Sequence, residues 1–510
     1  MAIDQFSRIG IVGAGNMGAM MALGLAEKGL DISIWDVKTQ NVDAAQEMAR
    51  QTLTLRGKVD AFHDVKDFMN SLSGERTKLF VFSITHGSPA DSVLEKIWDE
   101  LNEGDIILDG GNEHYRTTER RQRKCAEKGV RWVGMGVSGG YQSARHGPSL
   151  SPGGDKDAVS AALPVLEAFA AREPLSGKPC VTYIGPGGSG HYVKMVHNGI
   201  EHGMLSLVCE AWGLLRKSLG LSNAEIGTIL AAWNASGELR DCFLLEIGAE
   251  ICQRQKTPEG DQNGEGKGDF GYVLDDVLDK VVQDDDGTEG TGYWTVAETA
   301  LRHVAAPAVA AGHALRIASG NRAQRVKVAD KLKPPGRTET LRKKDTFIED
   351  LRLAVYAGFL ASFTQGLQLI ARASRDEEWD VSIADCLQIW RAGCIIRAGH
   401  IADLLQPVFV SSTAPIFNSK LIDEVARDIR ETYAPLKTVV TKGVEWDAVI
   451  PALSASLEYV KYAGNTELPT QFQEAQMDFF GAHGYDRVGV NGEDPGKTRK
   501  GAHHYEWRPA

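Results

Sequence analysis

Cysteine is scarce in this chain and stands at none of the spacings that mark redox or zinc sites. The seven cysteines among 510 residues are odd in number and scattered, and they include no CxxC pair. Because a disulfide framework needs paired cysteines, we expect reduced thiols. The HExxH pattern of many zinc enzymes is also missing, so His191, His197 and His202 predict no metal site.

The chain has no excess of basic residues. Its 56 lysines and arginines face 68 aspartates and glutamates, which gives a formal net charge of -12. Proteins that bind nucleic acids need a basic surface to neutralise phosphates, so we expect no nucleic-acid partner. A small anionic substrate stays possible, since the charge inside a pocket can oppose the net charge.

The sequence shows no apolar run that we expect to cross a membrane. Residues Met1-Ala-Ile-Asp4 run directly into the apolar stretch that begins near Ile9. A spanning helix needs about 20 mostly apolar residues. We therefore expect a cytoplasmic protein with no membrane partner.

Length and patterning predict three parts. With 43% hydrophobic residues the chain is an ordinary globular protein, long enough for two or three cores. The fold class we expect is an α/β Rossmann-type dinucleotide-binding domain, followed by a large all-α domain and a C-terminal tail. We place these parts at residues 1–186, 187–465 and 466–510.

The N-terminal motif predicts the dinucleotide site. A short strand at 9–12 leads into a glycine turn and then a helical run at 19–28, which is the order that a Rossmann fold needs. In such a turn the first glycine allows the tight bend, the second lets the backbone approach the pyrophosphate, and the third packs the helix on the strand. We expect cofactor contacts from the whole turn, Gly13, Ala14, Gly15, Asn16, Met17 and Gly18.

The second strand, 32–35, ends at Asp36. A carboxylate at this place accepts both ribose hydroxyls of NAD and repels the 2′-phosphate of NADP. Lys38, two residues further on, would offset that repulsion. The cofactor is therefore NAD or NADP, with NAD slightly favoured by Asp36; the alternative is that Asp36 is a simple turn residue.

Polar and glycine residues end two further strands of the same pattern. The strand at 105–108 is followed by Asp109-Gly-Gly-Asn112, and the strand at 130–133 by a segment that closes with Ser138-Gly139-Gly140. Ligands of open parallel sheets bind at the carboxyl edge, where such strand endings meet. Asn112 and Ser138 are thus predicted to contact the substrate or the nicotinamide.

A helix that opens at Gly190 is predicted to carry the chemistry. At 3.6 residues per turn, four polar groups share one of its faces, beside an apolar stripe: Lys194, His197, Asn198 and Glu201. A base, an acid and two hydrogen-bonding groups together suit acid/base catalysis. The plain alternative is a solvated helix face with an ordinary Lys–Glu pair.

Long helices dominate the rest of the chain. Apolar residues at three-to-four spacing predict helices at 225–233, 347–373 and 383–405. These are more apolar faces than one small core can bury, which suggests a dimer. The final residues are polar and rich in Gly and Lys; we interpret them as a tail in which Tyr505 and Trp507 act as docking anchors.

Six motifs, in order along the chain, resemble those of decarboxylating 6-phosphogluconate dehydrogenases. The resemblance covers nearly the whole chain. The motifs are Asp109-Gly-Gly-Asn112, Val137-Ser-Gly-Gly140 with Gly147-Pro-Ser-Leu-Ser-Pro-Gly-Gly154, Gly190-His-Tyr-Val-Lys-Met-Val-His-Asn-Gly199, Gly290-Thr-Gly-Tyr-Trp-Thr295, Trp390-Arg-Ala-Gly-Cys-Ile-Ile-Arg397 and Phe480-Gly-Ala-His483.

The resemblance implies an activity and an assembly. The family oxidises the C3 hydroxyl of 6-phosphogluconate with NAD(P), decarboxylates the β-keto acid and protonates the enediol to a pentulose 5-phosphate, in the pentose phosphate pathway and in gluconate use. It needs no metal, because the β-keto group is itself an electron sink. The resemblance also implies a homodimer in which the tail of each subunit reaches into the other.

Roles for single residues follow from the matching motif positions. By resemblance, Lys194 is the general base and Glu201 the general acid. A lysine base must spend time neutral, so we expect the site to lower its pKa from the usual value of about 10.4. The substrate contacts that the resemblance implies are Asn112, Ser138, Gly139, Gly140, His197, Asn198, His202, Thr291 and Arg316, with His483 from the partner subunit.

The departures from the family gather where it binds the 6-phosphate. His202 replaces a tyrosine, Glu289 a lysine and Met477 an arginine, while Thr291 and Arg316 remain. Three explanations stay open: compensation by a protonated His202 or a nearby insertion, a local misalignment at Glu289, or another 3-hydroxy acid without that phosphate as substrate. Thr85 and Asp36-Val-Lys38 also depart, on the cofactor side. A catalytically silent NAD(P)-binding protein is a third class of function, against which Lys194 and Glu201 argue.

Overall fold

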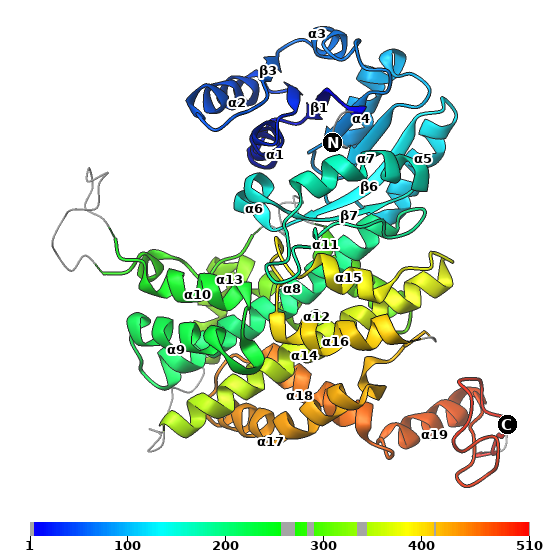
Figure 1. The fold of residues 1–510 in the computed structure, drawn as a ribbon. Coiled ribbons are helices and arrows are strands. Elements are labelled where there is room, and N and C mark those ends of the chain that lie inside the picture. The colour runs from blue at the N-terminus through cyan, green and yellow to red at the C-terminus, as the bar shows by residue number, and fades with distance from the viewer. Residues whose placement is uncertain (1–4, 257–270, 283–289, 334–343, 413–414, 509–510) are drawn as a thin grey trace. The chain divides into compact units, whose positions relative to one another are not determined.

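The structure is a computed structural model that describes residues 5–256, 271–282, 290–333, 344–412 and 415–508. The chain forms two compact units, residues 1–457 and 458–510. The first unit contains a sheet domain and a bundle of helices, and the second contains the C-terminal segment (Figure 1).

The N-terminal part of the first unit is built on a sheet that shows seven strands in the described residues. Its strand order is β3-β2-β1-β4-β5-β6-β7; β1 to β6 run parallel and β7 runs antiparallel to β6. This is the expected doubly wound Rossmann arrangement, extended by an antiparallel edge strand that the sequence did not predict. The strands are Arg8–Val12 (β1), Asp31–Trp35 (β2), Val59–Phe62 (β3), Leu79–Phe82 (β4), Ile106–Asp109 (β5), Arg131–Ser138 (β6) and Ser149–Gly153 (β7).

Both faces of the sheet are covered, which explains why its inner strands are continuously apolar. All four residues of β4 are buried, with Leu79 and Val81 in the core on one face and Phe80 and Phe82 in the core on the other. The first core is completed by α1 (Asn16–Glu27), α2 (Thr39–Gln51), α6 (Gly140–His146) and α7 (Lys156–Phe169), and the second by α3 (Val65–Asn70), α4 (Ser88–Ile97) and α5 (Tyr115–Ala126).

Helix α8 (Ser189–Gly213) joins the sheet to the helical bundle. It contacts β6, β7 and α5 on one side and α11, α12 and α14 on the other, and most of its residues are buried. A helix that is enclosed in this way is apolar around most of its circumference. Polar residues on α8 are therefore held inside the protein.

Most of the helices around α8 share one large apolar core. They are α9 (Asn223–Ala235), α10 (Phe243–Gln253), α11 (Thr291–Leu301), α14 (Lys344–Asp376), α15 (Ile383–Ile389), α16 (Gly399–Ser411) and α17 (Asp423–Glu445). Helix α12 (Pro307–Gly320) packs against α8 and α11 outside this core, and α13 (Arg322–Leu332) has no buried residue. The helix expected over 383–405 is wrong as a single element. It is interrupted between α15 and α16, where Gly393 takes a left-handed backbone (φ +67°) that a helix cannot accommodate.

Helix α14 corrects the expectation that no apolar run reaches membrane-spanning length. By length and composition it would pass as a spanning segment. However, 89% of its most apolar stretch is buried inside the protein. It packs against α8 and α17, as the core helix of a bundle does.

The second unit is organised around one buried carboxylate. Helix α18 (Pro451–Gly464) leads into it, and α19 (Thr470–Gly481) carries Asp478. This side chain accepts hydrogen bonds from the backbone N–H groups of Gly484 (3.0 Å) and Tyr505 (3.1 Å) and from the indole of Trp507 (2.9 Å). In this structure Trp507 thus folds the tail back on α19.

Candidate active site

The glycine turn after β1 has the shape that a pyrophosphate needs. Gly13 has φ +103°, and a Cβ there would lie 2.2 Å from the carbonyl oxygen of Ser83; a Cβ on Gly18 would lie 1.8 Å from the carbonyl oxygen of Gly13. Neither position tolerates a side chain. Gly15, by contrast, faces open space and precedes α1 without a side-chain cap. The first N–H groups of α1 therefore face an open cradle that fits an anion.

Asp36 lies beside this turn. Its carboxylate accepts hydrogen bonds from the backbone N–H groups of Ala14 (2.7 Å) and Lys38 (2.8 Å) and from the amide of Asn41 (3.1 Å). Asp36 is thus more than a turn residue, because it fixes the end of β2 against the glycine turn. A carboxylate has about four acceptor sites. Three are occupied here, so Asp36 can accept one further hydrogen bond from a ribose hydroxyl.

Glycines on both β6 and α8 let the helix lie directly on the sheet. A Cβ on Gly136 would lie 2.4 Å from the Cβ of Lys194, and a Cβ on Gly190 would lie 2.2 Å from the carbonyl oxygen of Gly134. Real Cβ atoms do not approach other atoms so closely, so both positions require glycine. The close packing of helix on strand places Lys194 at the carboxyl end of β6.

Lys194 meets Ser138 in the interior. Its Nζ donates a hydrogen bond of 3.1 Å to Ser138 Oγ, and the two residues are 7% and 5% exposed. Helix α8 and the glycine-rich end of β6 therefore meet at these two residues. The alternative of a solvated helix face does not hold for Lys194, His197 and Asn198, which are all buried.

A chain of hydrogen bonds extends from His197 to α11. His197 Nδ1 and Asn198 Oδ1 are 3.0 Å apart, and Asn198 Nδ2 donates to Thr291 Oγ1 at 2.9 Å. Burial, and then the charge of Lys194, hold the pKa of His197 well below its usual value. The ring is thus neutral, with Nδ1 as the donor. Its Nε2 is a buried acceptor that has no partner among the described residues.

Glu201 is less buried than its neighbours on α8. Its side chain is 21% exposed, and its Oε2 lies 3.8 Å from His197 Nδ1. Since His197 is neutral, we interpret this as a polar contact and not as an ion pair. His191 lies elsewhere, between Thr118 Oγ1 (2.6 Å) and the carbonyl oxygen of Asp109 (2.9 Å).

The turn after β6 is held by the segment between α15 and α16. A Cβ on Gly139 would lie 2.2 Å from the carbonyl oxygen of Gly393, which itself accepts a hydrogen bond of 2.9 Å from the N–H of Ser149. Gly139 (φ +104°) and Gly140 (φ +69°) both have left-handed backbones. These contacts explain why glycines occur in the motif at 137–140 and in the motif at 390–397.

The residues expected at the distal end of the substrate belong to different parts of the chain. His202, Thr291 and Arg316 lie together at the junction of α8, α11 and α12. Glu289 lies outside the described residues. Met477 and His483 belong to the second unit, where the His483 ring lies 5.8 Å from that of Phe480. Asn112 is half-buried in the loop between β5 and α5.

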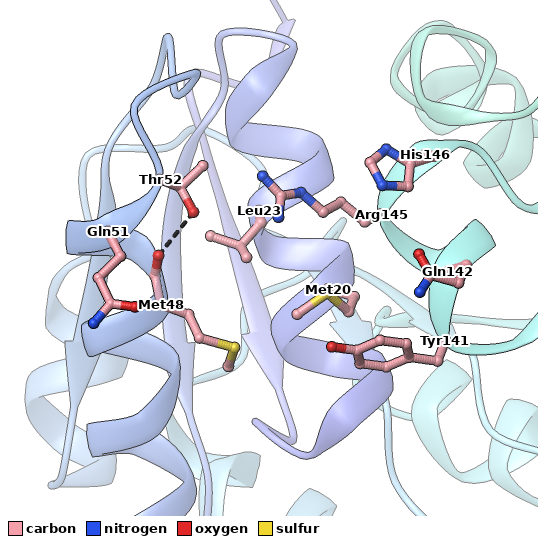
Figure 2. Close-up of a pocket in the computed structure, with 9 residues that line it drawn as sticks. All are labelled: Met20, Leu23, Met48, Gln51, Thr52, Tyr141, Gln142, Arg145 and His146. Atoms are coloured by element: carbon pink, nitrogen blue, oxygen red, sulfur yellow. Dashed lines mark hydrogen bonds between the residues drawn. The ribbon is translucent and has the colours of Figure 1, made fainter. Parts of the chain in front are cut away.

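A separate cavity of about 270 Å³ lies between α1, α2 and α6. Figure 2 shows its wall, with the hydrogen bond from Thr52 to the carbonyl oxygen of Met48 (2.7 Å). Arg145, also in the wall, donates a hydrogen bond to Glu27 (2.7 Å). It contains none of the predicted site residues. The lining residues are Met20, Leu23, Met48, Gln51, Thr52, Tyr141, Gln142, Arg145 and His146.

Comparison with known proteins identifies the family. Residues 8–185 match the NAD binding domain of 6-phosphogluconate dehydrogenase, and residues 190–507 match the C-terminal domain of 6-phosphogluconate dehydrogenase. The chain belongs to the 6-phosphogluconate dehydrogenase family. The resemblance given by the six motifs is confirmed.

Individual relatives agree with this assignment. A decarboxylating 6-phosphogluconate dehydrogenase of Emericella nidulans is 59% identical over 97% of this chain and 100% of its own length, and one of Spinacia oleracea is 39% identical over 98% of each. Among solved structures, a Plasmodium falciparum 6-phosphogluconate dehydrogenase, described with its cofactor NADP+ and its substrate 6-phosphogluconate, has a TM-score of 0.83 at 31% identity. That match covers 98% of this chain and 100% of that one.

Sequence reasoning missed three features of this 6-phosphogluconate dehydrogenase family member. The Gly134–Gly136 alternation on β6 was a visible signal for close helix packing. Asp478 gave no signal, because its partners follow it at irregular spacing. His313 of α12 was also missed; its ring stacks on that of His202, with centroids 5.6 Å apart and an angle of 11°.

Proposed function

We propose that this protein catalyses the NAD(P)-dependent oxidative decarboxylation of 6-phosphogluconate to ribulose 5-phosphate and carbon dioxide, a step of the pentose phosphate pathway. The observation that carries the proposal is the buried hydrogen bond between Lys194 and Ser138 at the carboxyl end of β6. It puts an amine beside the sheet edge at which Rossmann folds bind their ligands. Membership of the family supports the same reaction.

Residues 13–18 would hold the pyrophosphate of NAD(P), and Asp36 its adenosine ribose. When bound, the cofactor accepts the hydride from C3 of the substrate. Lys194 takes the proton of the C3 hydroxyl, so that the carbon becomes a ketone as the hydride leaves. The neutral His197 supports this step, since its buried Nε2 accepts a hydrogen bond from a substrate hydroxyl. We propose substrate contacts from Asn112, Ser138, Gly139, Gly140 and Asn198.

Decarboxylation leaves an electron pair that must be held and then protonated. The protonated amine of Lys194 stabilises the developing enolate oxygen, so the step requires no metal. Glu201, about two turns further along α8, delivers a proton to C1. Its partial exposure allows the carboxyl group to be reprotonated from solvent after each cycle.

We propose a slight preference for NAD over NADP. The carboxylate of Asp36 lies beside the glycine turn. In a Rossmann fold a carboxylate at this place would contact the adenosine ribose and repel a 2′-phosphate. Lys38 is exposed and follows Asp36 closely, so it would soften the repulsion. Both coenzymes are therefore expected to work.

We also propose the organisation of the active protein. The domains are a nucleotide-binding domain at 1–186, a substrate and dimerisation domain at 187–465, and a tail at 466–510. The active form is a cytoplasmic homodimer in which the tail of one subunit supplies His483 to the other. The two family models meet between residues 185 and 190, which supports the first of these boundaries.

One comparison tests the proposed reaction. Initial rates with 6-phosphogluconate and with gluconate, each with NAD and with NADP, give four values of kcat/KM. We expect 6-phosphogluconate to exceed gluconate by at least about a hundredfold, because charge-assisted contacts to the phosphate contribute about 1.5–3 kcal/mol each. Equal values for the two acids would favour a dehydrogenase of another 3-hydroxy acid that lacks the phosphate. No turnover of either acid would refute the proposal.

A further inference from the structure

Two buried histidines, one of them His202, and an arginine lie close together. His202 (4% exposed) and His313 (6% exposed) stack in parallel, and Arg316 lies on the same turn of α12 as His313. Gly292 makes room for both rings, since a Cβ there would lie 2.5 Å from His202 Cε1 and 2.7 Å from His313 Nδ1. The stacked rings therefore join α8 to α12, and α11 leaves the space for them at Gly292.

This pair is continuous with the candidate active site. Gly292 follows Thr291, whose hydroxyl accepts the hydrogen bond from Asn198. Along α8, His202 lies eight residues beyond Lys194, which corresponds to about 12 Å of helix. The pair therefore lies at the end of the site remote from the amine, where the far end of an extended sugar acid arrives.

A buried ring nitrogen of His202 and the nearby positive charge of Arg316 favour binding of an anion. Among the described residues, His202 Nδ1 is buried without a hydrogen-bond partner, which costs free energy unless a ligand supplies one. The charged or titratable groups found facing His202 are Arg316 and His313 of α12; α11 contributes Gly292, and α14 contributes Ser362 beside Gly203. The pKa of His202 is lowered to about 3, mainly by burial and then by the charges of Arg316 and His313. All three causes oppose a further positive charge, and a phosphate dianion would reverse that effect.

We propose that His313 is a specificity-determining residue of this enzyme: stacked on His202, it forms an imidazole pair that takes up one proton when the substrate phosphate binds. This inference rests on the proposed function. One proton is expected and not two, because two imidazolium rings in contact repel each other. The proton then replaces a cation that the sequence lacks at positions 289 and 477, which are Glu and Met. Discrimination for the phosphate is thereby linked to pH.

His313→Phe tests the role of the proton, because it keeps a stacking ring and removes the ionisable nitrogens. At pH 7.5 the phosphate is already a dianion. We expect KM for 6-phosphogluconate to rise about tenfold or more in this variant, with KM for gluconate and for the coenzyme unchanged. His63→Phe, at a surface histidine of the nucleotide-binding domain, is the matched control. Unchanged KM for 6-phosphogluconate in His313→Phe would overturn the inference.

Calorimetry measures the proton directly. Binding enthalpies of 6-phosphogluconate in buffers of different ionisation enthalpy give the protons taken up per site. We expect the wild-type protein to take up more protons per site than His313→Phe, by up to about one proton. Any change in the protonation of Lys194 is common to both proteins and cancels in this difference. His313→Gln serves if the Phe variant does not fold. Equal uptake with normal wild-type turnover would refute this inference alone, whereas no turnover by wild-type protein would refute the proposed function.

Discussion

A Cβ atom on Gly136 of β6 would lie 2.4 Å from the Cβ atom of Lys194 on α8. The absence of a side chain at position 136 therefore sets how closely the helix approaches the strand. That approach brings the lysine Nζ within 3.1 Å of Ser138. A residue with no chemistry of its own thus determines where the proposed base lies.

Replacing Gly136 by alanine is expected to reduce both stability and turnover. The added methyl group must push α8 away from β6, and overpacking of this kind costs about 1–3 kcal/mol. A displacement of about 1 Å at the base reduces kcat by about a hundredfold. Urea unfolding and steady-state rates measure both effects. Gly74→Ala, at a position that faces open space, is the control. Wild-type kcat in Gly136→Ala would contradict the role of close packing.

Asp36→Asn is expected to shift coenzyme preference towards NADP. The substitution removes the charge that repels a 2′-phosphate but leaves one oxygen to accept the hydrogen bond from Ala14. The ratio of kcat/KM for NADP to that for NAD measures the effect, and the melting temperature controls for loosening of the turn. An unchanged ratio would mean that Asp36 does not contact the adenosine ribose.

Glu210 is expected to make stability fall as pH rises from about 4.5 to 7. Its carboxylate is buried on α8, accepting hydrogen bonds from the N–H groups of Ala452 (2.8 Å) and Leu453 (2.9 Å), and burial raises its pKa to about 7. The folded state therefore binds more protons than the unfolded state in this window, which lowers the free energy of unfolding by roughly 3 kcal/mol as pH rises. Denaturant titrations of wild type and Glu210→Gln check this. An identical pH slope in both would refute it.

Asp478→Asn is expected to loosen the tail. The amide replaces one of the two oxygens that accept bonds from Gly484, Tyr505 and Trp507, so at least one donor loses its partner. The hydrogen bond with His504 (2.9 Å), and after it these three bonds, outweigh burial and hold the pKa of Asp478 well below its usual value. Their contribution is present above about pH 4 and is lost as pH falls below it. Hydrogen exchange of residues 482–508 is the readout, with Glu474→Gln on the exposed face of α19 as control. Unchanged exchange in Asp478→Asn would contradict this account of the tail.

Much of the fold could be predicted because its signals are local. The glycine turn at 13–18 and the apolar strands around it follow from short-range geometry, and the polar face of α8 follows from helical periodicity. The antiparallel pairing of β7 with β6 depends on contacts between whole segments, which the local pattern does not contain. The break between α15 and α16 likewise depends on Gly393 reaching Gly139 across the fold.

The candidate site was predictable to the same extent. Lys194, His197 and Asn198 share one helix face, so their convergence could be predicted. His313 could not, because it reaches His202 only through the packing of α12 on α8. The burial that makes His197 neutral is also a tertiary property, as it arises from the neighbours that enclose α8 and not from the spacing of residues along it.

Substitution of Lys194 tests the central claim most directly. The measurement is the rate of NAD(P)H and carbon dioxide formation from 6-phosphogluconate by wild type, Lys194→Met and the surface control Lys66→Met, together with the coenzyme Kd. General-base catalysis contributes about 10²–10⁴-fold. We predict that Lys194→Met loses at least about a hundredfold in both products while its coenzyme Kd stays at the wild-type value. Turnover by Lys194→Met within a few-fold of wild type would show that another group removes the proton.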